Sequence, residues 1–220
     1  MKKIEDKPKS RLKPILLTKK YSEELAEFIG IMLGDGSIKL PKKGDRGYRI
    51  RICGNSETDR DYLLNYVNPL SIKLFGIEFS IYYHSCSKAI YLTKSNKHLY
   101  YTLLHFGLKP GNKKINNISI PDWIFSNKKY IRACIRGLLD TDGCVSKHKN
   151  RNYTLIWFKS AIPNLRKSFS NSMDILGYKI AKWTGQTDTL QTCIAARGML
   201  RKYKEEIGFS NPKHERKFMI

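Results

Sequence analysis

Two aspartates in matching contexts are the residues best suited to chemistry in this 220-residue chain. Asp35 and Asp142 each precede a glycine and each follow a run of apolar and small residues. Small residues recur at four-residue spacing in both runs: Ala26, Gly30 and Gly34 in the first, Ala133, Gly137 and Thr141 in the second. Two carboxylates held close together repel each other, and a divalent cation between them relieves the repulsion. The repeat therefore points to a metal site shared by two copies of one element.

The two runs predict a pair of helices that pack against each other. At four-residue spacing the small residues lie on one helix face, which lets two backbones approach closely. Packing through that face would bring the two C-terminal ends together and set Asp35 beside Asp142. The glycine after each aspartate permits a sharp exit into a following strand. A single Asp-Gly run would more readily be interpreted as the end of a core helix. The duplication of the run is what favours a functional role for the two aspartates.

The order of the remaining elements repeats along the chain. The first half predicts helices over 22–33, 59–75 (disturbed at Pro69) and 96–106, with two strands within 39–54 and a hairpin of 79–83 and 89–93. The second half predicts helices over 131–139, 165–176 and 197–207, with strands over 145–147, 153–158, 178–183 and 190–195. The sequence therefore predicts an α+β fold of two αββαββα units.

Four regions follow from this pattern. Residues 1–20 carry eight basic and two acidic side chains and form a basic N-terminal arm. The first unit is expected over 21–108 and the second over 122–220. Between them, residues 109–121 have the composition of a linker.

Charge and cysteine usage narrow the class of protein. The chain has 41 Lys and Arg against 19 Asp and Glu, a net charge of +22, which favours nucleic acid as partner over an anionic membrane surface or the ribosome. No apolar stretch is long enough to span a membrane and no secretory signal is visible, so an intracellular location is expected (cytoplasm or nucleoid, or an organelle in a eukaryote). The five cysteines form no CxxC pair, so any metal must be held by carboxylates.

The motifs resemble those of the LAGLIDADG homing endonucleases of the two-motif, single-chain kind. The matching segments are LAEFIGIMLGDGSI (25–38) and IRACIRGLLDTDGCV (131–145). The resemblance implies a monomer with internal pseudo-twofold symmetry, in which the motif helices form the interface and two antiparallel sheets form a DNA-binding saddle. It implies hydrolysis of both strands of a long duplex site, cut across the minor groove. Because Met1 lies 24 residues before the first motif, a free-standing, intron-encoded enzyme is favoured over an intein.

The resemblance also implies roles for particular residues. Asp35 and Asp142 would bind Mg²⁺ or Mn²⁺, with the main-chain carbonyls of Gly34 and Thr141 helping to hold metal or water; Ca²⁺ should bind without supporting cleavage. Asp140 is treated as auxiliary, because Leu33 stands at its place in the first copy. The family tends to place a basic or amide residue near the site from each half. The candidates are Lys113, Lys159 and Lys213, with Lys114, Lys217 and the pair Gly54–Asn55 as alternatives.

Base and phosphate contacts are expected from the two sheets, which would lie along the major groove. Arg49 and Arg51 alternate with Ile50 and Ile52, so both guanidinium groups leave one face of a strand. The other candidates, chosen by similar placement, are Lys39, Ser80, Tyr82, His84 and Lys88 in the first half, and Lys159, Lys182, Thr184, Gln186 and Gln191 in the second.

Other classes of protein fit less well. A haloacid-dehalogenase-type phosphatase would need a strand before Asp140, where a helix is predicted. An EF-hand would need further ligands after Asp142, where Gly143 follows at once. An aspartic protease would need an all-β chain. The alternative that stays open is a protein of the same fold without nuclease activity, either a DNA-binding protein or a maturase that binds intron RNA.

Overall fold

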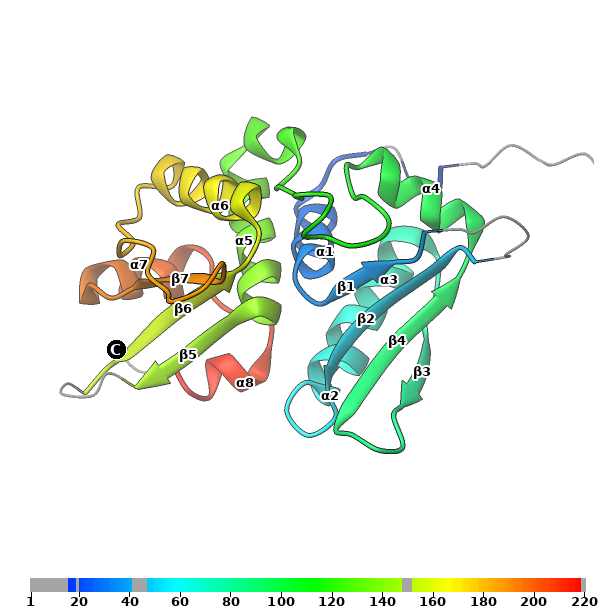
Figure 1. Cartoon of the computed structure of the whole chain (residues 1–220), viewed down its shortest axis with the longest axis horizontal. Coiled ribbons are helices and arrows are strands. Elements are labelled where there is room, and N and C mark those ends of the chain that lie inside the picture. Colours follow the sequence, from blue (N-terminus) through cyan, green and yellow to red (C-terminus); the bar gives the residue numbers. More distant parts are fainter. Residues whose placement is uncertain (1–15, 19, 41–46, 148–151, 219–220) are drawn as a thin grey trace, which may run out of the picture.

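The computed structural model describes residues 16–18, 20–40, 47–147 and 152–218. Most of the predicted basic arm lies outside these ranges. Figure 1 shows two sheets on either side of a central pair of helices, α1 and α5. Among the described residues, no helix is long and apolar enough to cross a membrane.

The first half begins with α1 (Glu23–Leu33), whose N-terminus is capped because the Leu25 N–H donates to Ser22 Oγ at 3.1 Å. Its sheet is antiparallel, in the order β1-β2-β4-β3. The strands are β1 (Gly36–Ile38), β2 (Arg49–Asn55), β3 (Ser80–Tyr83) and β4 (Ala89–Ser95). The helices that accompany them are α2 (Arg60–Tyr62), the π-helix η1 (Leu63–Val67), α3 (Asn68–Phe75) and α4 (Lys97–His105).

The second half begins with the 3₁₀-helix η2 (Asp122–Ser126) and α5 (Lys128–Asp142). Its described sheet is antiparallel with the order β5-β6-β7. The strands are β5 (Gly143–Lys147), β6 (Thr154–Ser160) and β7 (Leu190–Ile194), and the helices are α6 (Pro163–Ile175), α7 (Arg197–Glu206) and α8 (Pro212–Glu215). The α+β fold with two antiparallel sheets is therefore confirmed.

The motif helices pack as the small-residue spacing predicts. A Cβ added to Gly30 would overlap the main-chain oxygen of Cys134, and one added to Gly137 would overlap that of Glu27. Only glycine at these points lets the backbones of α1 and α5 come so close. Leu25, Phe28 and Ile29 of α1 are fully buried in the core that both helices share.

Several element boundaries differ from the prediction. The first strand starts at Gly36 rather than after residue 39, because Asp35 already joins the ladder by accepting the Cys53 N–H at 3.1 Å. The helix over 59–75 continues through Pro69, whose missing N–H is accommodated by a π turn in which Asn68 N–H donates to Leu63 O. α5 extends to Asp142, and α8 was not predicted.

The strand predicted over 178–183 is not a regular strand. This segment runs beside β7 but pairs with it only at intervals: the Ala181 N–H donates to Cys193 O at 2.9 Å, and Thr184 forms an isolated bridge with Gln191. The Thr192 hydroxyl donates a hydrogen bond to the Ala181 carbonyl at 2.6 Å. In a continuous ladder a backbone N–H would donate to that carbonyl. A side-chain bond thus interrupts the fourth strand of this sheet.

Candidate active site

The two motif aspartates meet where α1 and α5 end. Asp35 follows the last turn of α1, and Asp142 is the last residue of α5. Burial raises the pKa of Asp35 to about 7, and the negative charge of Asp142 adds to the rise. Burial also raises the pKa of Asp142. Two poorly hydrated carboxylates that feel each other's charge form a site that favours a cation or a proton.

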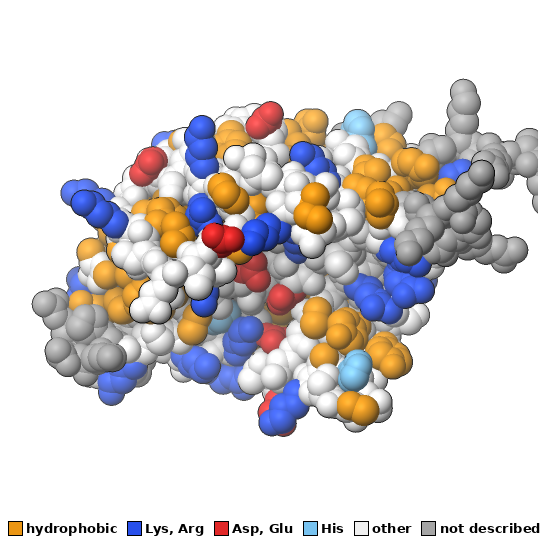
Figure 2. Space-filling model, in the orientation of Figure 1, with side chains coloured by type: hydrophobic (Ala, Val, Ile, Leu, Met, Phe, Trp, Pro, Cys, Tyr) orange, Lys and Arg blue, Asp and Glu red, His pale blue; other side chains and the backbone are white. Residues whose placement is uncertain are grey.

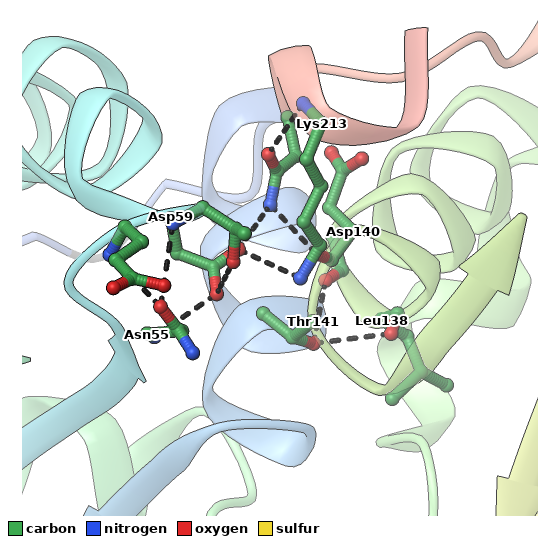
Figure 3. A network of polar contacts seen from close by, with 10 residues as sticks. Asn55, Asp59, Leu138, Asp140, Thr141 and Lys213 are labelled. Carbon is green, nitrogen blue, oxygen red and sulfur yellow. Dashed lines mark hydrogen bonds and ion pairs between the residues drawn. The ribbon is translucent and has the colours of Figure 1, made fainter. Parts of the chain in front are cut away.

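Gly34 and Thr141 set how closely these ends approach. A Cβ on Gly34 would overlap the Thr141 side chain and lie 3.4 Å from Asp142 Cγ. The Thr141 hydroxyl in turn donates to the carbonyls of Gly137 and Leu138 at 3.0 Å each, which keeps it turned onto its own helix (Figure 3). The residues predicted to flank the aspartates therefore lie at the contact between the two helices.

Lys113 reaches the site from the segment that connects the two halves. Its Nζ donates to the carbonyls of Leu33 at 2.9 Å and Gly34 at 2.5 Å, the last carbonyls of α1. Burial lowers the pKa of Lys113 to about 8, although the charges of Asp142 and Asp35 oppose that shift. The alternative, Lys114, forms an exposed ion pair with Asp188 at 3.1 Å. Lys113 is thus the linker lysine at the aspartates.

Lys213 reaches the site from the C-terminal segment. Its Nζ lies 2.6 Å from Oδ1 of Asp59, a buried carboxylate that sequence reasoning missed (Figure 3). The same Oδ1 accepts the Asn211 side-chain amide at 2.9 Å, and Oδ2 accepts the Asn55 N–H at 3.0 Å. These bonds lower the pKa of Asp59 even though burial opposes them. Asp59 therefore holds Lys213 beside the paired aspartates, where the Lys213 charge opposes the rise that burial causes in the pKa of both carboxyls.

Lys159 lines an open cleft of about 620 Å³, to which residues of both halves contribute. Lys113, Lys114, Asp142 and Lys159 all contribute to this cleft. The strand register shows what stands at the place of Lys159 in the first half. Gly36 lies opposite Ile52 and Gly143 opposite Phe158, so the next pairs are Asp35 with Cys53 and Asp142 with Lys159. The first-half counterpart of Lys159 is therefore Cys53, the residue before the alternative pair Gly54–Asn55.

A buried polar network joins the halves next to the aspartates. Arg136 of α5 lies 2.5 Å from Glu27 of α1, whose other oxygen accepts the hydroxyls of Tyr66 at 2.8 Å and Ser210 at 2.7 Å. Asp140, predicted to be auxiliary, is fully buried and accepts the Ser210 N–H at 2.9 Å. Asp140 therefore helps to attach the C-terminal segment to α5. Glu27 had a signal in the sequence, as the one charged residue within the apolar and small-residue run of 25–33.

The candidate DNA-contacting residues of the first half share one sheet face where the register can be followed. Arg51 lies opposite Thr93, which lies opposite Ser80, and Tyr82 lies opposite Tyr91. The Arg51 guanidinium stands over the Tyr91 ring, 5.6 Å from its centroid. Sequence reasoning missed Tyr91 and Thr93 on this face. His84 lies just beyond β3, and Lys88 forms an ion pair with Glu57 at 2.9 Å.

In the second half, Lys159 lies opposite Gln191, which bridges to Thr184, so these three residues share a face. Lys182 and Gln186 are exposed in the irregular segment that precedes β7. Figure 2, in the orientation of Figure 1, shows acidic side chains at the centre of this view with basic side chains over both halves. A polyanion laid across this face would meet positive charge on either side of the central acidic side chains.

The donor set at the centre fits a hard divalent cation. Carboxylates and main-chain carbonyls are the oxygen ligands that Mg²⁺ and Mn²⁺ accept. Within the described residues, no group of three or more His, Cys, Asp or Glu gathers as a metal site. Mg²⁺ commonly keeps water and substrate phosphate as its remaining ligands, so a site with two carboxylates is compatible with this ion.

Comparison with known proteins agrees with this geometry. A family model described as a LAGLIDADG-like domain matches residues 129–208, from α5 through α7. The structure of I-DmoI in complex with DNA and Mn superposes with a TM-score of 0.59 at 22% identity, covering 84% of this chain and 96% of that one. This protein has the LAGLIDADG fold. The predicted resemblance is confirmed.

Two further proteins are similar to this chain. The N-terminal LAGLIDADG domain of DUF199/WhiA superposes with a TM-score of 0.56 at 16% identity, covering 87% of each chain. The replication factor C small subunit of Methanocaldococcus jannaschii is 29% identical over 149 residues, 64% of this chain. This chain spans only 8% of that protein's length. These likenesses establish the fold and leave the activity to be argued from the site.

Proposed function

We propose that this protein is a site-specific endonuclease that cuts both strands of duplex DNA with the help of a divalent metal ion. One observation carries the proposal: two motif helices bring Asp35 and Asp142 together, and the resulting desolvation and repulsion raise the pKa of Asp35 to about 7. A protein that only binds DNA has no need of two carboxylates in a place that phosphates approach. Retaining them is explained if a cation is to be held there.

Asp35 and Asp142 would hold Mg²⁺ or Mn²⁺, with the carbonyls of Gly34 and Thr141 nearby. The bound ion would supply an activated water and neutralise charge on the leaving oxygen. Lys113 adds a fixed positive charge beside the carboxylates, because the carbonyls of Leu33 and Gly34 hold its ammonium there. An ammonium so placed stabilises the negative charge that develops on a phosphate during cleavage.

The basic sheet faces support a duplex DNA partner. I-DmoI, which has the same fold and is described as a homing endonuclease, has been crystallised with DNA and Mn, with DNA and Ca, and as a variant with its target DNA and Mg. We extend the proposal to a monomer acting on a long, asymmetric site with cuts across the minor groove. Homing from an intron and an intracellular location belong to the same proposal.

Cleavage of a randomised duplex library tests the proposal. The wild-type protein and the variant Asp35→Asn/Asp142→Asn are incubated with the library and Mg²⁺, and the cut ends are sequenced. Recurring cuts at one long sequence, absent with the variant, are expected. Binding of the library in Ca²⁺ without any cut in Mg²⁺ or Mn²⁺ would contradict the proposal and favour a nuclease-dead binder; intron RNA would then be the next ligand to test.

A further inference from the structure

The two lysines at the centre have different partners. Lys113 donates to two main-chain carbonyls, which carry no net charge to cancel its own. Lys213 forms an ion pair with Asp59 at 2.6 Å, with 19% of the lysine side chain and 9% of the aspartate side chain exposed. A carboxylate this close and this poorly hydrated offsets part of the charge that the lysine would offer to a phosphate.

The bonds of Asp59 keep this ion pair in place. Its carboxylate accepts hydrogen bonds from Asn55 and Asn211 as well as Lys213. Asn211 is fully buried, and its amide also donates to the Asp140 carbonyl at 3.1 Å. Asp59 therefore ties the C-terminal segment to the first half, and Lys213 cannot turn to a new partner without breaking an established network.

The strand register adds a second difference between the halves. Lys159 stands opposite Asp142, whereas Cys53 stands opposite Asp35. Lys159 and Lys113 line the shared cleft together with Asp142. The side of Asp35 has an uncharged thiol and a lysine that is already paired with Asp59. A pseudo-symmetric pair of phosphates would meet more free positive charge on one side than on the other.

We propose that Asp59 is a positioning residue that neutralises Lys213, so that the strand beside Lys113 and Lys159 is cut first and the opposite strand more slowly. This inference rests on the proposed function. A nicked duplex then precedes the double-strand break. The asymmetry is a property of charge placement, so it should respond to single substitutions that leave the fold intact.

The test is to follow each strand separately. A duplex containing the site recovered from the library carries a different fluorophore on each strand, and single-turnover cleavage is measured in Mg²⁺. We expect one strand to be cut at least about tenfold faster, which corresponds to about 1.4 kcal/mol of barrier. Asp59→Asn should speed cleavage of the slow strand and bring the ratio of the two strand-cleavage rates below about threefold. Lys113→Met should slow the fast strand instead.

Cys53→Lys supplies a second, independent variant. It places a lysine at the counterpart of Lys159 and should also narrow the ratio, even if Asp59→Asn fails to fold. DNA binding in Ca²⁺ and thermal unfolding report on the fold of each variant. Equal strand rates in the wild type, or an unchanged ratio in folded Asp59→Asn and Cys53→Lys, would overturn the inference. No cleavage by the wild type would instead overturn the proposed function.

Discussion

Gly30 of α1 lies directly against the Cys134 carbonyl of α5, so that a Cβ at position 30 would overlap that oxygen and lie 3.0 Å from the Leu138 nitrogen. This contact sets the separation of the two motif helices, and with it the meeting of Asp35 and Asp142. A backbone cannot yield as a flexible side chain can, so the whole helix pair must move if the space is filled.

Gly30→Ala should therefore lower the free energy of unfolding by about 1–3 kcal/mol despite the better helix propensity of alanine. Gly198→Ala is the matched control, because Gly198 lies in α7 with no atom within 4 Å of an added Cβ. The control should be neutral or stabilising by up to about 1 kcal/mol. Urea unfolding measures both. Equal stability of the two variants would contradict the close helix contact.

The ion pair between Glu27 and Arg136 should be more important to stability than pairs on the surface. Arg136→Met would leave the Glu27 carboxylate, 2% exposed, without its charged partner, at a cost of about 3 kcal/mol. Adding Glu27→Gln should recover part of this loss because no buried charge remains. Lys73→Ala, which breaks an exposed pair with Glu24, should cost less than about 1 kcal/mol. A similar loss of stability for Arg136→Met and Lys73→Ala would contradict the greater importance of the buried ion pair.

Asp35 should weaken the metal-free fold above neutral pH. Its folded pKa, about 7, lies above the ordinary value of 3.8, so the folded protein binds more protons between these values. Stability then falls as pH rises from about 4 to about 7, by at most about 1.4 kcal/mol per pH unit from this group. Asp35→Asn should be more stable than the wild type at pH 8 in EDTA, with the difference vanishing near pH 4. Unfolding curves at both pH values measure this difference in stability. A variant less stable than the wild type at pH 8 would contradict the prediction.

Arg51 should contribute to DNA binding through the exposed face of the first sheet. Loss of one phosphate contact by Arg51→Ala would weaken binding and reduce the slope of log K against log salt by about 0.9. Arg201→Ala is the control, since Arg201 is exposed on α7, a helix that packs into the core through Leu200 and Tyr203. Affinities in Ca²⁺ at several salt concentrations give both slopes. An unchanged slope for Arg51→Ala would remove this residue from the interface.

The motif helices could be predicted from sequence because their signal is local. The four-residue spacing of Gly30 and Gly34, and of Gly137 and Thr141, describes one helix face, and the duplication indicates what that face meets. The side chains of the β2 face follow from simple alternation. Lys113 and Lys213 came from the family resemblance, and the structure sets both beside the aspartates.

The polar network around the aspartates could not be predicted in the same way. Asp59 and Asn211 are 152 residues apart, and Glu27 and Arg136 are 109 apart, so no local pattern links them. Weak signals did exist. Asn55 accepts the N–H groups of Glu57 and Thr58 in a side-chain turn that points to an ordered loop before Asp59, and Asn211 precedes a proline that can start a helix. Neither signal says which partner the side chain meets.

The central claim is that Asp35 and Asp142 together drive cleavage. It is tested most directly with the duplex site from the library, measured for binding in Ca²⁺ and for cleavage in Mg²⁺ with the wild type, Asp35→Asn and Asp142→Asn. We predict that each single variant binds the site about as tightly as the wild type but cuts it more than about a hundredfold more slowly, the equivalent of about 3 kcal/mol. Cleavage at the wild-type rate by either folded variant would contradict the account.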